Sequence, residues 1–130
     1  MQKTVLMNSP MITSTGHSQV WVKVNAPIDA GIADVVSILN RIEGLHTLDS
    51  CEGISGAKPA HVYFNYGDWH QIGDLMFNRL GPALFERFGS EATVSVELFN
   101  YSEPMGKLSF DKEATPSVAS VLDQLLHERP

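Results

Sequence analysis

One short stretch of the chain gathers residues that could carry chemistry. Residues 45–53 read L-H-T-L-D-S-C-E-G, and they hold the only cysteine, Cys51, beside Glu52 and Gly53. A thiolate is both a nucleophile and a metal ligand. A strand that ends in small polar residues and glycine also presents side chains and backbone N–H groups beyond the edge of its sheet. The stretch therefore predicts where a functional site lies, although it does not name a substrate.

His61 is the histidine that could act together with Cys51. A nucleophilic thiol needs a neighbouring base, so the pair would suit a thiol-dependent enzyme if the fold brings the two residues together. The structural alternative is that Cys51 is a small, partly buried side chain and that His61 is a hydrogen-bonded surface residue. Both interpretations stay open on the sequence.

Two other classes of site lack the residues that they need. His46 precedes Cys51 by five positions, which is roughly 16 Å along an extended strand, so His46, Cys51 and His61 cannot all bind one ion. Gly53 and Gly56 are not followed by the lysine and helix of a phosphate-binding loop. We therefore expect neither a metal nor a cofactor.

The composition is that of a single globular domain. The chain has 130 residues, of which 43% are hydrophobic and 18% are charged, and this is enough to build a core without disulfides. The net charge of −6 opposes attraction to nucleic acids and to anionic lipids. One cysteine cannot form an internal disulfide, and no signal peptide or membrane span is recognisable, so we expect a cytoplasmic protein.

Changes in hydrophobic period divide the chain into strands and helices. Residues 20–24 alternate valine with other residues, which indicates a strand with one buried face. From Asp29, the predicted N-cap, the apolar spacing becomes helical, and Gly44 ends that helix. Further strands are expected at 45–51, 61–66, 91–101 and 108–110, and a hairpin turn at 102–106 leads into the last of them. Further helices are expected at 68–88, with Asp68 as the N-cap and a kink or a fresh start at Gly81-Pro82, and from Thr115 onward.

The order of these elements contains the split βαβ pattern of ferredoxin-like domains. We therefore predict an α+β protein, a ferredoxin-like split βαβ sandwich with an added C-terminal strand and helix. In this arrangement the first two strands run parallel, and the third lies between them and antiparallel to both. Residues 19–130 would form the domain, preceded by a flexible N-terminal extension at residues 1–18.

The predicted topology brings the ends of three strands to one edge of the sheet. If Val62 and Phe64 face the helices, then His61 and Tyr63 face the other way. We expect Leu48 to face the helices too, which places Asp49 and Cys51 on the same open face as His61. Trp21, Tyr63 and Phe99 make this face aromatic. The candidate ligand-binding residues are Trp21, Lys23, Asn25, Asp49, Ser50, Cys51, Glu52, His61 and Tyr63.

An aromatic face without helices has three explanations. Self-association is the first, a ligand site shared between subunits is the second, and base stacking on RNA is a distant third that the acidic charge disfavours. Stacking groups, Lys23, amide side chains and the helix start near Asp29 suit a base joined to a phosphate. We therefore expect a homo-oligomeric binding domain for a small nucleotide-like ligand, such as a phage protein that sequesters a signal. The alternative is a thiol-dependent or tRNA-modifying enzyme that uses Cys51 and His61.

Two local resemblances accompany this interpretation. Residues 25–36, N-A-P-I-D-A-G-I-A-D-V-V, and residues 44–53, G-L-H-T-L-D-S-C-E-G, resemble a family of small bacterial and phage-type proteins with a T-x-x-S-C-x-G strand end. That resemblance runs from Val20 onward and implies no assigned activity. Residues 50–53 are also similar to the S-S-C-S-G-R element of wybutosine-synthesising tRNA methyltransferases, which implies an S-adenosylmethionine site. This chain departs from that element by lacking its arginine and by carrying Glu52.

Overall fold

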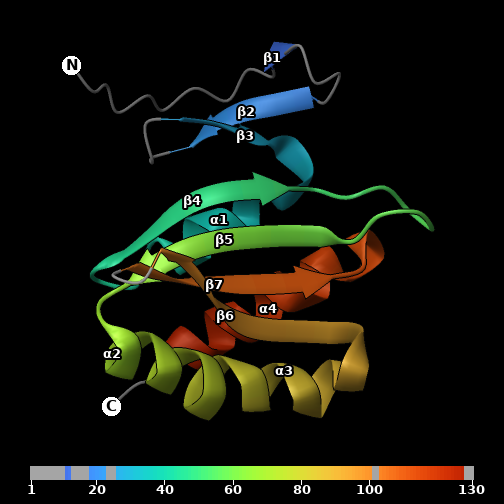
Figure 1. Cartoon of the computed structure of the whole chain (residues 1–130). Helices are drawn as coiled ribbons and strands as arrows, with labels where there is room; N and C mark the ends of the chain where they lie inside the picture. The colour runs from blue at the N-terminus through green and yellow to red at the C-terminus, as the bar shows by residue number, and fades with distance from the viewer. Residues whose placement is uncertain (1–10, 13–17, 23–25, 101–102, 128–130) are drawn as a thin grey trace.

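Alternating apolar residues build a four-stranded antiparallel sheet (Figure 1). The computed structural model describes residues 11–12, 18–22, 26–100 and 103–127. The four strands are β4 (Leu45–Cys51), β5 (Ala60–Tyr66), β6 (Ala92–Asn100) and β7 (Glu103–Phe110). They lie in the order β4-β5-β7-β6, and each neighbouring pair is antiparallel. The predicted α+β class is confirmed.

One face of this sheet is covered by helices and forms the core. Val62, Phe64 and Leu108 are fully buried there. Gly106 is the cross-strand partner of Phe64, and a Cβ at this glycine would lie 2.8 Å from the Phe64 ring. The missing side chain therefore lets the ring lie close against β7.

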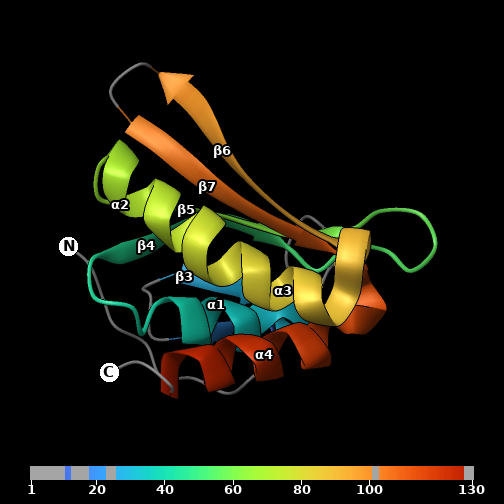
Figure 2. The ribbon, with the colours of Figure 1, turned by 90° about the horizontal axis from the view of Figure 1, so that it is seen from below.

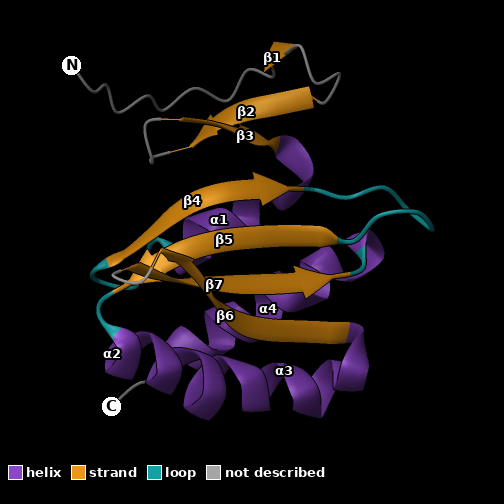
Figure 3. Ribbon diagram, in the orientation of Figure 1, coloured by secondary structure: helices purple, strands orange, loops and turns teal. Residues whose placement is uncertain are grey.

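The helices lie on that one side of the sheet, as Figures 2 and 3 show. They are α1 (Ala33–Leu39), α2 (Trp69–Gly73), α3 (Gly81–Phe88) and α4 (Thr115–His127). The predicted cap of the second helix is confirmed, because Asp68 and Gln71 form a capping box. Among the described helices, none has both the length and the apolar character needed to cross a membrane.

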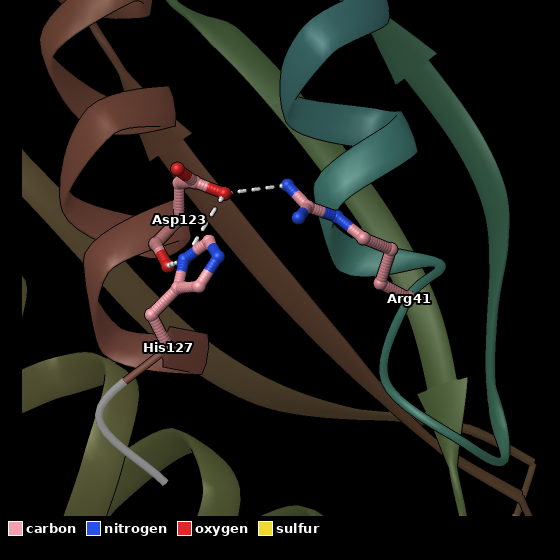
Figure 4. Close-up of polar contacts among 3 residues, drawn as sticks. All are labelled: Arg41, Asp123 and His127. Atoms are coloured by element: carbon pink, nitrogen blue, oxygen red, sulfur yellow. Dashed lines mark hydrogen bonds and ion pairs between the residues drawn. The ribbon is translucent and has the colours of Figure 1, made fainter.

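An ion pair joins the turn after α1 to α4 (Figure 4). Arg41 Nη2 lies 2.7 Å from Asp123 Oδ1. The His127 ring accompanies them, with Nδ1 2.8 Å from the backbone oxygen of Asp123. The Arg41 and Asp123 side chains are about half exposed, so the pair adds little stability.

At Gly81-Pro82, where a kink or a fresh start was expected, α3 begins directly after a wider helical turn. Residues Asp74–Leu80 are π-helical and connect α2 to α3 without a break. The Gly81 N–H donates to the Met76 carbonyl, five residues back. Proline has no N–H to donate, and this wider turn accommodates its lost hydrogen bond.

A second, three-stranded sheet lies beside β4 (Figure 1). It consists of β1 (Met11–Ile12), β2 (Ser18–Val22) and β3 (Ala26–Asp29), in that order. The predicted first strand corresponds to β2, which pairs with β1 and β3 rather than with β5. The expected split βαβ arrangement, with the third strand between the first two, is therefore wrong. Closing the short connection from β2 to β3 costs little entropy, and Pro27 is tolerated because β3 is an edge strand.

Candidate functional site

The face of the large sheet that the helices leave open carries residues in cross-strand rows. One row follows β4, β5, β7 and β6 through Cys51, His61, Ser109 and Thr93. The adjacent row contains Asp49, Tyr63, Lys107 and Ser95. Directly opposite residues share a face of the sheet. The structure thus brings together four of the predicted site residues: Asp49, Cys51, His61 and Tyr63.

A bulge in β4 sets the direction of two of these side chains. The register shifts between Thr47 and Asp49, so Thr47 pairs with buried Phe64 while Asp49 pairs with Tyr63 on the open face. Leu48 occupies the extra position and is 50% exposed. The expectation that Leu48 faces the helices is therefore wrong. Asp49 reaches the open face because one residue is inserted, and simple alternation from Thr47 would have buried it.

Cys51, His61 and Asp49 form a compact group at one end of this face. His61 Nε2 lies 3.7 Å from Asp49 Oδ2, and the half-buried Cys51 is the direct cross-strand partner of His61. The His61 ring also meets the edge of Tyr63, with 5.4 Å between ring centres. A thiol beside an imidazole that contacts a carboxylate is an arrangement that can support nucleophilic chemistry.

A pocket of about 500 Å³ lies on the same open face. Its walls come from all four strands and consist of Leu48, Asp49, Tyr63, Asn65, Glu97, Glu103 and Met105. Leu48, Tyr63 and Met105 provide apolar surface, whereas Asp49, Glu97 and Glu103 provide carboxylates. The volume is in the range of about 300–1,000 Å³ that is typical of small-molecule sites.

Sequence reasoning missed Glu103 and Met105. The segment 102–106 was expected to be a turn, but β7 begins at Glu103. Residues 103–110 read E-P-M-G-K-L-S-F. Polar residues at one parity alternate with apolar residues at the other over most of this segment, and this is the signal that could have identified the strand.

Two residues that were predicted to bind the ligand, Ser50 and Glu52, do not lie at the pocket. Ser50 pairs with Val62 and so belongs to the helix-covered side. Glu52 accepts a hydrogen bond from the Gly31 N–H at 2.9 Å, and its other oxygen lies 3.5 Å from Lys112 Nζ. The helix start that was expected to receive a phosphate thus already binds a carboxylate of the protein. Lys23 and Asn25 lie outside the described residues, as does the side chain of Trp21.

Asp29 was expected to cap the first helix through its side chain. It precedes a short 3-10 turn, Ala30–Ile32, and makes no side-chain cap hydrogen bond there. Its carboxylate is buried and accepts instead from the Glu52 N–H at 3.3 Å. Asp29 and Glu52 therefore join the end of β4 to this turn, which leads into α1.

The loop after β4 is tied to the turn before α4 by a second acidic group. The Ser55 side chain donates a hydrogen bond that lowers the pKa of Glu113, with smaller contributions from a backbone hydrogen bond and the charge of Lys112. A lowered carboxylate pKa gives a stabilising contribution that is present at neutral pH and lost as the pH falls through that pKa. Glu113 is fully exposed, so this contact helps to position the loop but adds little to the stability of the protein.

The chain was compared with models of protein families, with curated proteins and with solved structures, and none of them matches it. Within the part of the chain that the structure describes, no three His, Cys, Asp or Glu residues are grouped to hold a metal ion.

Proposed function

We propose that the protein is a binding domain for a small organic ligand and that the pocket on the open sheet face is its site. The observation that carries this proposal is the convergence of apolar and polar walls from four strands on a face that no described helix covers. Tyr63 and Met105 offer apolar contact, and Asn65 offers an amide for orientation. This is the composition expected of a small-molecule site.

Of the nucleotide-like ligand that the sequence predicts, this proposal retains the base. A base could stack on Tyr63 and form hydrogen bonds with Asn65. A phosphate has less support, because Glu52 already accepts from Gly31 and because Asp49, Glu97 and Glu103 surround the pocket. We propose that the binding form is a homo-oligomer, as the uncovered amphipathic face suggests.

A fragment screen on the full chain, followed by NMR of methyl and aromatic groups, tests the proposal. Bound fragments should shift the resonances of Met105 and Tyr63. Leu48→Ser and Met105→Ser should weaken the same fragments about tenfold or more, because each removes apolar wall area. Ile54→Ser is the control, since Ile54 is exposed to a similar extent and does not line the pocket. Binding that is unaffected by both wall variants, or no binding at all, would contradict the proposal.

Thiol chemistry at Cys51 is the second candidate function. It is favoured by one observation, the cross-strand pairing of Cys51 with His61 next to the Asp49 carboxylate. If His61 activates the thiol, iodoacetamide should alkylate Cys51 at a rate that stays high below neutral pH, and His61→Gln should abolish this plateau. A rate that simply rises towards alkaline pH, unchanged by His61→Gln, would exclude this function.

A further inference from the structure

We infer that the ligand of the open-face pocket is an organic cation, an amine or guanidinium joined to an apolar or aromatic group. This inference rests on the proposed function and names the ligand class of the same site. It depends on which charges surround the apolar surface and where they stand.

Three carboxylates surround the pocket, each from a different strand. Asp49 comes from β4, Glu97 from β6 and Glu103 from β7, and none of the described residues that line the pocket is a lysine or an arginine. Glu97 is half-buried, lies opposite Met105 and accepts from the Ser95 hydroxyl at 3.4 Å. An anionic ligand would meet like charges around the pocket, whereas a cation would meet opposite charges.

The pocket also has apolar surface, so its ligand needs an apolar part as well as a positive charge. Leu48, Tyr63 and Met105 line the pocket together with the carboxylates, and Leu48 is half exposed. A small hydrated metal ion would leave this apolar surface in contact with water. An amine attached to a ring or an alkyl chain would cover it and gain the hydrophobic contribution as well.

A positively charged side chain of the protein, Lys107, already lies over the Tyr63 ring of the pocket wall. Lys107 Nζ lies 5.3 Å from the centre of the Tyr63 ring, a distance at which the ring attracts positive charge. Lys107 is the cross-strand partner of Tyr63 and is therefore an internal competitor for a cationic ligand. Its removal should strengthen cation binding, but it should weaken the binding of an anion.

Three probes of different charge distinguish these cases. Tryptamine is a cation, indole-3-propionate is an anion with the same ring, and adenosine monophosphate represents the nucleotide. NMR titrations of the full chain should show tryptamine shifting Tyr63 and Met105, at concentrations where the two anions do not. Its affinity should fall as salt is added, because the carboxylates are partly exposed and therefore screened.

Charge variants give the sharper test. Glu97→Gln and Glu103→Gln should each weaken tryptamine about threefold to tenfold, and Lys107→Met should strengthen it. Glu86→Gln on α3 is the control, since Glu86 is exposed and does not line this pocket. Unchanged affinity in both pocket Glu variants, or weaker binding in Lys107→Met, would overturn the inference.

The results also separate the inference from the proposed function. If anionic or neutral compounds bind at least as tightly as tryptamine and lose affinity in Met105→Ser, the pocket is a binding site but its ligand is not a cation. If no compound shifts Tyr63 or Met105, the proposed function and the inference both fail.

Discussion

Glu52 is held by polar contacts at the junction between β4 and the 3-10 turn that precedes α1. Its side chain is only 14% exposed and lies 3.5 Å from Lys112 Nζ, one oxygen accepts from Gly31, and its own N–H donates to Asp29. A carboxylate held in this way serves the fold. This explains why a residue that the sequence assigned to a ligand does not face the pocket.

Replacing Glu52 should therefore destabilise the protein. Glu52→Ala removes a charged acceptor from the Gly31 N–H and should lower the free energy of unfolding by about 1–3 kcal/mol. Glu52→Gln keeps an acceptor oxygen and loses the ion pair with the partly exposed Lys112, so its cost should be below about 1 kcal/mol. Urea unfolding followed by circular dichroism measures both.

Glu43→Ala is the control for general effects of removing an exposed carboxylate. Equal losses of stability in Glu52→Ala and Glu43→Ala would show that the Gly31 contact contributes nothing. A larger loss in Glu52→Gln than in Glu52→Ala would also contradict the assignment.

Single side chains on the open face were predictable to the extent that strand alternation held. His61 and Tyr63 follow regular alternation in β5 and were placed on the correct face. Leu48 was not, because an inserted residue leaves no periodic signal in a seven-residue strand. The carboxylates of the pocket come together only through strand pairing, and the spacing along the chain does not reveal it.

The loop between β4 and β5 contains two glycines that can be compared directly. Gly53 and Gly56 have positive φ angles of 78° and 73°. A Cβ at Gly53 would lie 2.7 Å from the Lys58 carbonyl oxygen and from the Ala60 nitrogen, whereas a Cβ at Gly56 would meet nothing within 4 Å. The two positions therefore share the backbone strain but differ in steric contact.

Alanine substitutions at Gly53 and Gly56 should separate the free-energy cost of the strained backbone from the cost of the steric clash. Gly56→Ala should lower the free energy of unfolding by about 1–2 kcal/mol, the cost of a left-handed conformation for a residue with a Cβ. Gly53→Ala adds a clash with the backbone and should cost at least about twice as much. Thermal and urea unfolding test this difference, and equal losses in the two variants would contradict the packing around Gly53.

Whole elements were more predictable than their boundaries and pairings. The strand at residues 45–51 was predicted correctly, and the one at 61–66 begins only one residue earlier. The strand Ala26–Asp29 was missed because Asp29 was taken as the N-cap of the first helix. The π-helical turn before Pro82 was unexpected, since the sequence indicates that a regular helix is interrupted but not which wider turn replaces it.

At the scale of the whole molecule, strand pairing was the step that periodicity could not decide. β4 with β5 and β6 with β7 pair as neighbours in the sequence, and β5 with β7 joins the two pairs. The α2–α3 region connects β5 to β6 on the helix-covered side (Figure 2). The opposite face consequently stays open and carries both the pocket and the amphipathic surface that suggested self-association.

Self-association through this open face is the last prediction. Light scattering at micromolar concentration should show more than one subunit, and Leu48→Glu should reduce the mass to that of one chain, because it introduces a charge into an interface core. Leu48 is the test position because Trp21, which was expected on this face, lies in the small sheet. Phe85→Glu on α3, where the phenylalanine is 69% exposed, should leave the assembly intact. Far-UV dichroism should be unchanged in both variants. A monomeric parent chain, or dissociation by Phe85→Glu alone, would move the interface away from the open face.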